Sequence, residues 1–492
     1  MSNLEKYFER FRNDIIGQNQ LFNTPFGEKK IVYGDWIASG RLYKQIEEKI
    51  AKDFGPFVGN THTETNVTGT SMTKAYHKAH EIIKNHVNAG PNDVIITAGF
   101  GMTAIINKFQ RILGLKCPEQ LNQYLKMPDE MKPVVFVTHM EHHSNQTSWL
   151  ETLADVVVLE PDTNGHVDTN QLRNKIADYK NRKLKIGSFT ACSNVTGIQT
   201  PIHELAKIMH ENEGLCFVDY AASAPYVKIN MHPKNPLEKL DAIFFSPHKF
   251  LGGPGTSGVL IFDSQLYQRE TPDQPGGGTV DWTNPWGHHK FISNIEMRED
   301  GGTPGFLQAI RSALCIQLKE QMDPDKMLSR EEELVKIVFQ ELSQIPGLHI
   351  LADNIKERLG VISFYVDKIH FNLIVQLLND RFGIQVRGGC VCAGTYGHYL
   401  LHIDQHESKR ITDKINKGDL SEKPGWVRLS LHPTMTNDEI YFITTAIGEI
   451  VKNIGQWAED YQYSNITNEY KHVKSSEKEY DHMQDWFEFN QS

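Results

Sequence analysis

The chain has 492 residues, of which 39% are hydrophobic and 23% charged, and its formal net charge at pH 7 is −10. This length predicts two or more domains with large apolar cores. The negative charge, with no Lys/Arg-rich run to offset it, excludes generic binding to the phosphate backbone of nucleic acids. No apolar run is long enough to cross a bilayer, and the charged amino terminus lacks the apolar segment of a signal peptide. Six cysteines are too few for a disulfide framework in a chain of this length, so we expect a cytoplasmic protein.

The first 325 residues alternate short apolar runs with patterns of helical periodicity. After a turn-rich arm, residues 1–45, which we expect to pack with the C-terminal part of the chain, the first clear unit is the strand Asp93–Thr97. An Ala-Gly-Phe-Gly turn follows it, and then a helix from Met102. Such a turn leaves free N–H groups at the start of a helix, and these suit a phosphate. The other predicted strands are Pro133–Thr138, Val156–Glu160, Ile186–Ala191, Leu215–Val218, Ala242–Phe245 and a run after Gly258; the other predicted helices are Met72–Val87, Val167–Tyr179, Pro201–Asn212 and a stretch that ends near Glu320.

Strands that alternate with helices predict an α/β fold with a mostly parallel, doubly wound sheet, which we assign to a large domain at residues 46–325. Residues 326–492 predict a smaller α+β domain with a tail. Its elements are a helix near Leu328, the strand Gly360–Val366, the helix Phe371–Phe382, the strand Trp426–His432 and a helix for which Thr436 is the N-cap, with Glu439 three residues on. Residues 114–132, 280–300 and 404–423 interrupt these patterns as insertions.

Chemically active side chains follow several of the predicted strands. Asp219 directly follows Leu215–Val218, and Ser246-Pro247-His248-Lys249 follows Ala242–Phe245, with a Gly-Gly-Pro-Gly turn beyond. Ligands of open α/β sheets collect at the carboxyl ends of the strands. A surface salt bridge beside a tight turn is the plainer interpretation of one aspartate and one lysine. The density of Ser, His, Lys and Gly at one strand end favours a ligand site instead.

Pyridoxal phosphate is a cofactor that needs this set of residues. A lysine links covalently to its aldehyde and later moves protons, while an aspartate keeps its pyridine nitrogen protonated. Its phosphate needs N–H groups and hydroxyls, and its ring needs a stacking partner. No metal site is expected, because the adjacent His142 and His143 rarely point the same way on regular structure. The Cys390-x-Cys392 spacing lacks a second ligand cluster.

On these motifs the sequence resembles the class V aminotransferase family of fold-type I pyridoxal phosphate enzymes, and within it the branch of cysteine desulfurases and selenocysteine lyases. The resemblance runs from about Tyr33 to about Ile454. Its most specific motif is Phe245–Lys249 with the following Gly-Gly-Pro-Gly, in frame with Asp219 thirty residues earlier. It implies that Lys249 is the Schiff-base lysine and that Asp219 pairs with the pyridine nitrogen. The other implied contacts are His142 stacked on the ring, Asn194 near the phenolic oxygen, and Ser246, His248, Phe100 and Gly101 around the phosphate.

The resemblance also implies binding partners. Arg428 matches the arginine that clamps the α-carboxylate of an amino-acid substrate, and a guanidinium suits such bidentate binding. Gly278 and Thr279 belong to a Gly-Gly-Gly-Thr segment that resembles the one reaching the cofactor of a second subunit, which implies a homodimer. A sulfur-acceptor protein is a further implied partner.

The cysteine turn resembles the desulfurase pattern Arg-x-Gly-x-x-Cys-Ala, with Arg387 at its start and Cys392 at the nucleophile position. In the implied reaction the thiolate of Cys392 attacks the sulfur of L-cysteine, which leaves a persulfide on the protein and releases L-alanine. An ordinary thiol, with a pKa of about 8.5, is mostly protonated at neutral pH, and a nearby Arg387 or His398 would favour the thiolate. The alternative is that Cys390 and Cys392 are small buried residues without a chemical role.

Two departures from the desulfurase pattern leave other functions open. Ala222 stands three residues after the aspartate, where desulfurases have a glutamine that supports the phenolic oxygen. Gly394–His398 is not the usual continuation after the nucleophile, and Cys390 is an additional thiol. We favour a cysteine desulfurase. The alternatives are an aminotransferase, epimerase or β-eliminating lyase with passive cysteines, and a non-catalytic binding or scaffold protein that retains the fold.

Overall fold

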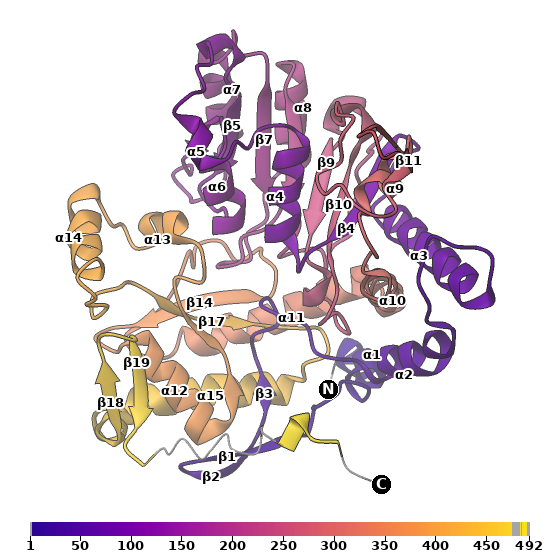
Figure 1. Ribbon diagram of the computed structural model, residues 1–492. Helices are drawn as coiled ribbons and strands as arrows, with labels where there is room; N and C mark the ends of the chain where they lie inside the picture. The colour runs from indigo at the N-terminus through magenta and orange to yellow at the C-terminus, as the bar shows by residue number, and fades with distance from the viewer. Residues whose placement is uncertain (1, 475–482, 484, 490–492) are drawn as a thin grey trace.

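The computed structural model describes residues 2–474, 483 and 485–489, and it contains a large and a small β-sheet with helices packed around them (Figure 1). The strands of the large sheet are β4 (Asp93–Ala98), β5 (Val134–Thr138), β6 (Asp155–Leu159), β7 (Lys185–Thr190), β8 (Leu215–Asp219), β9 (Ala242–Phe245) and β10 (Gly258–Asp263). Their order is β4-β10-β9-β8-β7-β5-β6. The pairings from β9 to β6 are parallel, whereas β10 runs antiparallel to β9 and β4. The expected α/β fold with a mostly parallel sheet is confirmed, with β10 as the reversed strand.

Both faces of the large sheet are covered by helices, which explains why its strands read as continuous apolar runs. Phe217 and Phe244 pack on the face that carries α4 (Met102–Ile112) and α6 (His143–Leu150). The residues next to them in the chain, such as Val218 and Ile243, point to the opposite face and join the other apolar cluster. The helices of this second face include α8 (Ile202–Glu211), α7 (Thr169–Asp178), α3 (Val67–His86) and α10 (Phe306–Met322).

The small sheet is antiparallel and has the order β13-β14-β17-β16. Its strands are β13 (Leu348–Ile350), β14 (Val361–Val366), β16 (Arg387–Gly389) and β17 (Trp426–Ser430). The helices around it are α11 (Pro324–Leu342), α12 (Phe371–Phe382), α13 (Gly394–Leu400) and α15 (Asn437–Trp457). The predicted helix cap is confirmed, because Thr436 and Glu439 form a capping box at the start of α15.

The N-terminal segment lies against the small sheet. The hydroxyl of Ser2, the N-cap of α1 (Asn3–Arg12), donates to Glu333 Oε2 on α11 at 2.7 Å. Farther on, β3 (Val32–Tyr33) pairs in parallel with β15 (Ile384–Gln385), and Asp35 forms a parallel bridge to Ser430. These contacts place the side chain of Asp35 beside β17. The remaining N-terminal elements are the hairpin β1 (Leu21–Thr24) and β2 (Gly27–Lys30), then α2 (Lys44–Lys49), η1 (Ile50–Phe54) and η2 (Gly55–Phe57).

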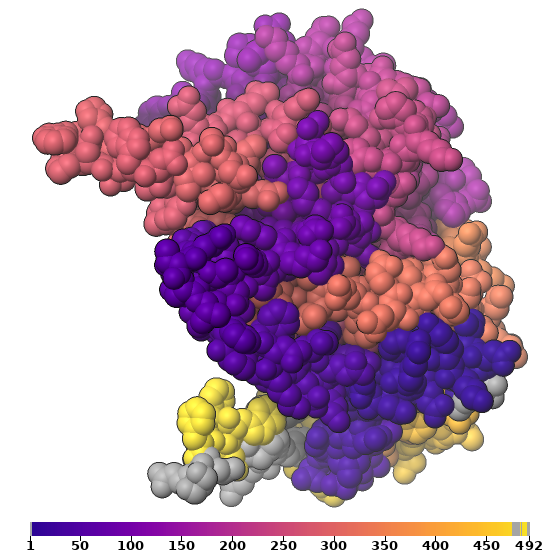
Figure 2. Space-filling model, turned by 90° about the vertical axis from the view of Figure 1, so that its right-hand side faces the viewer, coloured from indigo at the N-terminus to yellow at the C-terminus, as the bar shows by residue number. Residues whose placement is uncertain are grey.

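The three insertions contain short elements of their own. They are α5 (Glu119–Asn122) with η3 (Asp129–Met131), then β11 (Val280–Thr283), β12 (His289–Phe291) and α9 (Ile295–Glu299), and finally α14 (Gln405–Ile415). The β11–β12 hairpin projects from the body of the protein (Figure 2). Trp286, between its two strands, is 80% exposed. Strands so short and so exposed carry no apolar alternation, so residues 280–300 show no pattern from which their secondary structure could be predicted. After α15 the chain forms a second hairpin, β18 (Tyr461–Ser464) and β19 (Glu469–His472). No helix in the described part of the chain is long and apolar enough to span a membrane.

Candidate active site

Asp219 and Lys249 lie at the carboxyl ends of two neighbouring parallel strands. Asp219 is the last residue of β8 and pairs in register with Phe244 of β9, and the short helix η5 (Pro247–Lys249) follows β9 closely. Asp219 is 3% exposed, and burial raises its pKa to about 6 although Ala221 N–H and Lys249 oppose this shift. Burial also lowers the pKa of Lys249 to about 8, against the charge of Asp219. The structure therefore places an acid and an amine with displaced pKa values at one edge of the sheet.

Both groups have atoms available to a ligand. Asp219 Oδ1 accepts a hydrogen bond from Ala221 N at 2.8 Å, whereas Oδ2 has no hydrogen-bond partner among residues 2–474. Over the same residues, Lys249 Nζ makes neither a hydrogen bond nor an ion pair within 4.0 Å. A carboxylate oxygen and an amine that are held in place but unpaired suit the two ends of a small aromatic cofactor.

The glycine turn after β4 forms a cradle beside this edge. Gly101 has φ +118°, and a Cβ added there would lie 2.9 Å from His248 Cε1 and 3.0 Å from Ser246 Oγ. Only glycine fits this position without a clash. The hydroxyl of Ser246 accepts from Met102 N at 2.8 Å, at the start of α4, and Phe100 is 93% exposed. Burial lowers the pKa of His248 to about 4, so its ring is neutral at pH 7. The cradle joins a helix N-terminus, a hydroxyl and an imidazole, a set that suits a phosphate.

His142 lies at the start of α6, as the helix N-cap. Its Nδ1 accepts from Ser144 N at 3.1 Å, which fixes the ring. Burial, assisted by the charge of Lys249, lowers the pKa of His142 to about 3, so the imidazole is neutral and suits stacking on an aromatic ring. Beneath it Glu141 is buried and accepts from the N–H groups of Thr138 (3.1 Å) and Thr190 (2.9 Å), and burial raises its pKa to about 7.

Arg428, on β17, lies in a buried group of charges. It is 3% exposed; its Nη1 donates to Asn194 O at 3.2 Å and its Nη2 to Asp35 Oδ1 at 2.8 Å. The second oxygen of Asp35 accepts from Arg387 Nε at 3.0 Å. Burial lowers the pKa of Arg428 despite the carboxylate of Asp35. In the described residues, the buried Nε of Arg428 and Oδ1 of Asn194 have no hydrogen-bond partner.

The cysteine turn lies beside this group. Asn194 Nδ2 donates to Val391 O at 2.9 Å. Asn194, which also contacts Arg428, is therefore joined to the residue that precedes Cys392. His143 N donates to Cys392 O at 2.8 Å, and His143 Nε2 accepts from Gly394 N at 2.9 Å. Cys392 itself is exposed. The structure thus brings together Lys249, Asp219, Ser246, His248, Gly101 and His142 at one edge, and Asn194, Arg428 and Cys392 at the adjoining turn.

Gly278 and Thr279 are placed differently from the other candidates. They lie at the base of the β11–β12 hairpin, where Thr279 is buried and its hydroxyl donates to Gly276 O at 2.6 Å. No contact from either residue to Lys249 or to the glycine cradle is present in the described residues. Within a single chain they are therefore not part of the assembled site.

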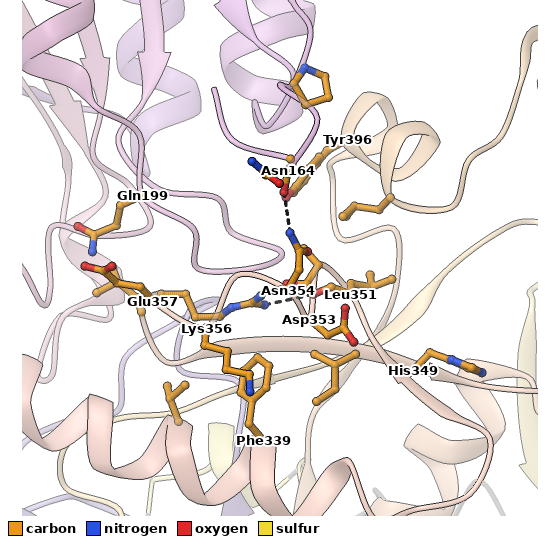
Figure 3. Close-up of a pocket in the computed structure, with 18 of the residues that line it drawn as sticks. Asn164, Gln199, Phe339, His349, Leu351, Asp353, Asn354, Lys356, Glu357 and Tyr396 are labelled. Atoms are coloured by element: carbon orange, nitrogen blue, oxygen red, sulfur yellow. Dashed lines mark hydrogen bonds between the residues drawn. The ribbon is translucent and has the colours of Figure 1, made fainter. Parts of the chain in front are cut away.

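A cavity of about 1500 Å³ lies on another part of the molecule, between the loop after β6, α11, the β13–β14 connection and α13 (Figure 3). Asn354 Nδ2 donates to Asn164 O across it at 2.8 Å. None of the residues predicted for cofactor or substrate binding lines this cavity. It is therefore distinct from the candidate active site.

Residues 32–442 match the sequence model of the family described as "Aminotransferase class-V". The chain belongs to this class-V family. Among the relatives, "Probable cysteine desulfurase" of Staphylococcus aureus strain Mu50 is 27% identical over 385 residues, 77% of this chain and 87% of that protein. The protein of the same description from Halalkalibacterium halodurans is 27% identical over 367 residues, 74% of this chain and 84% of that protein.

Solved structures support the same fold for this class-V chain. The apo cysteine desulfurase of Thermococcus onnurineus NA1 superposes with a TM-score of 0.72 at 24% identity, covering 90% of this chain and 98% of the other. The cysteine desulfurase CsdA of Escherichia coli, in an S-sulfonic acid form, gives a TM-score of 0.69 at 21% identity, covering 92% and 99%. The predicted family and fold are therefore confirmed.

The structure also places residues at the site that the sequence prediction missed. Asp35 pairs with both Arg428 and Arg387, and His143 holds the cysteine turn at two points. Gly40 N donates to His248 O at 2.9 Å, so the N-terminal segment touches the backbone that carries Lys249. His143 stands next to His142 in the predicted motif, and that adjacency was a usable signal. No local sequence pattern marks Asp35 or Gly40 as a site residue, because their partners are more than two hundred positions away.

Proposed function

We propose that the protein is a pyridoxal phosphate-dependent cysteine desulfurase that converts L-cysteine to L-alanine and collects the sulfur on Cys392. One observation carries this proposal: the exposed Cys392 stands on a turn joined by Asn194 to Arg428, the predicted carboxylate clamp. A substrate held by Arg428 would present its side chain close to this turn. The named activity of the relatives from Staphylococcus aureus and Halalkalibacterium halodurans supports the same reaction.

The residues present fit pyridoxal phosphate. The cofactor, once linked to Lys249, would supply an electron sink for the bonds at Cα of the substrate. The unpaired Oδ2 of Asp219 would hold the proton of the pyridine nitrogen, and the neutral ring of His142 would stack on the cofactor. The cradle at Gly101, with Ser246 and His248, would hold the phosphate, together with the backbone at Phe100.

The chain's own groups then perform the following steps. Arg428 binds the α-carboxylate, and the unpaired Oδ1 of Asn194 accepts a hydrogen bond from the bound ligand. Lys249, whose pKa is lowered to about 8, takes and returns the proton at Cα near neutral pH. The thiolate of Cys392 attacks the sulfur of the substrate; an S–S bond forms, the Cβ–S bond breaks, and Cβ is protonated as the product becomes alanine.

The proposal includes a homodimer in which Gly278 and Thr279 of one subunit reach the cofactor of the other. The projecting β11–β12 hairpin beside these residues supports it. A sulfur-acceptor protein would take the persulfide sulfur. Action in the reducing cytoplasm is supported by the six cysteines, which form no disulfide in the described residues. The division into an arm (1–45), a large domain (46–325) and a small domain (326–492) with its tail is part of the same proposal.

The experiment is a turnover assay with the purified, cofactor-loaded protein and L-cysteine, in which alanine and protein persulfide are both measured. We expect alanine formation in the wild type and its loss in Cys392→Ser. Cys117→Ser, at a partly exposed cysteine in the 114–132 insertion, is the matched control. Lys249→Ala should lose the cofactor linkage that borohydride fixes. Unchanged alanine formation by Cys392→Ser refutes the desulfurase; cofactor binding without alanine favours the aminotransferase, epimerase or lyase alternative, and no cofactor binding favours the scaffold alternative.

A further inference from the structure

The turn that carries Cys390 and Cys392 is short, and three of its carbonyl groups accept hydrogen bonds. Strand β16 ends at Gly389 and helix α13 begins at Gly394, so only four residues connect them. The carbonyl of Cys390 accepts from Ala393 N at 3.0 Å, that of Val391 from Asn194 Nδ2 at 2.9 Å, and that of Cys392 from His143 N at 2.8 Å. A sulfur atom on Cys392 therefore has little freedom to travel on a swinging loop.

The same turn holds a second thiol within reach of the first. Two Cα atoms separated by one residue are at most about 7 Å apart even in an extended chain. A disulfide needs a Cα separation of about 4.4–6.8 Å. The hydrogen bond from Ala393 N to Cys390 O folds these residues into a turn, which shortens the separation below its extended limit. Cys390 is half-buried and packs against the apolar core, while Cys392 is exposed.

We propose that Cys390 is the resolving thiol of the reaction: it attacks the inner sulfur of the Cys392 persulfide and releases the substrate sulfur as hydrosulfide. This inference rests on the proposed desulfurase function and adds the fate of its sulfur. The Cys390 Sγ–Cys392 Sγ bond forms, and the bond from Cys392 Sγ to the outer sulfur breaks. The outer sulfur leaves with the electron pair of that bond, and the proton of the Cys390 thiol accompanies it, so that the protein is left with one disulfide and the product is hydrogen sulfide.

The proposal requires a reductant of a stated class. An external dithiol returns the disulfide to two thiols and is itself oxidised to a disulfide, which completes the cycle. A disulfide on a tight and exposed turn belongs to the strained, easily reduced kind rather than to the structural kind. Cys390 thus gives the persulfide a second route, in which sulfide leaves when no acceptor protein is bound.

The chain offers a direct assay, because trypsin cleavage after Arg387 and Lys409 releases both cysteines in the single peptide Gly388–Lys409. The cofactor-loaded protein is reduced, freed of reductant without air, and mixed with less than one equivalent of L-cysteine per subunit. Thiols are then alkylated, and the mass of the peptide is measured by mass spectrometry. In the wild type we expect about one sulfide per alanine, and a peptide that is two hydrogen atoms lighter and unalkylated.

Cys390→Ser is expected to form alanine as before but to release at least about 10-fold less sulfide per alanine, with its peptide one sulfur atom heavier. Cys390→Ala should behave in the same way. Cys117→Ser should match the wild type, and Lys249→Ala should form no disulfide. Alanine formation with a lasting persulfide in the wild type, or undiminished sulfide release by Cys390→Ser, overturns the role of Cys390 alone. Absence of alanine in the wild type overturns the proposed function and this role together.

Discussion

Asp35 offers the sharpest test of the charge arrangement at the site, because one of its oxygens pairs with a buried arginine and the other with an exposed one. Arg428 is 3% exposed, whereas the side chain of Arg387 is 55% exposed. Asp35→Ala removes the carboxylate that both arginines share. Among the described residues, Arg428 then keeps only its hydrogen bond to Asn194 O and becomes a buried charge without a counter-ion.

The magnitude follows from burial. Removal of one partner of a buried ion pair costs about 3–5 kcal/mol, because the remaining charge is left desolvated. An exposed ion pair contributes about 0–1 kcal/mol, so Arg387→Ala should lower the free energy of unfolding by no more than that. Asp35→Ala is therefore expected to destabilise the protein by about 3 kcal/mol or more, nearly all of it through Arg428.

The assay is equilibrium urea denaturation of Asp35→Ala, Arg428→Leu, the double variant and the wild type, with Arg387→Ala as the matched control. The double variant should lose less than the sum of the single losses by about 1–3 kcal/mol, because it leaves no orphan charge. Additive losses, or an equal loss in Arg387→Ala, would refute the buried-pair reasoning.

The remaining predictions concern the backbone, the pH response and a helix cap. A Cβ at Gly40 would lie 1.9 Å from Phe250 O, so Gly40→Ala should lower the free energy of unfolding by more than about 2 kcal/mol in urea denaturation and should lower cofactor occupancy. A Cβ at Gly455 would meet no atom within 4 Å, so Gly455→Ala should raise the free energy of unfolding by about 0.5–1 kcal/mol. Because the pKa of Asp219 is raised to about 6, lowering the pH through 6 should protonate it and weaken cofactor binding in a fluorescence titration; the same pH step in Asp219→Asn would contradict this. Thr436→Ala should lose about 1 kcal/mol in the same urea assay, and no loss would mean that the capping box is dispensable.

The part of the site that could be predicted from the sequence is the part built by local pattern. Strand β9 was predicted with its observed bounds, because a buried run of apolar residues ends abruptly at Ser246. Helix α12 was likewise predicted from Phe371 to Phe382, since its periodicity and the following Gly383 mark both ends. Such signals lie within a few residues of the structure they predict.

What could not be predicted depends on contacts between distant segments. The pairing of Asp35 with Arg428 joins residues 393 positions apart, and no local pattern predicts it. The reversed direction of β10 is equally invisible, because a buried strand reads as apolar whether it runs parallel or antiparallel. The hydrogen bonds that fix the Cys390–Cys392 turn come from Asn194 and His143, on two other loops.

The place of β4 in the large sheet has a consequence for synthesis on the ribosome. Its sheet neighbour is β10, and the paired residues Ala98 and Gly258 are 160 positions apart in the chain. At about 5–20 residues per second, translation of that interval takes roughly 8–32 s, during which β4 has emerged without its partner. An unpaired apolar strand is prone to aggregate, so the nascent chain is exposed to this risk over the interval. The glycine cradle after β4 likewise lacks Ser246 and His248 until they are synthesised, so the phosphate binding proposed for it would be a late event in the maturation of the protein.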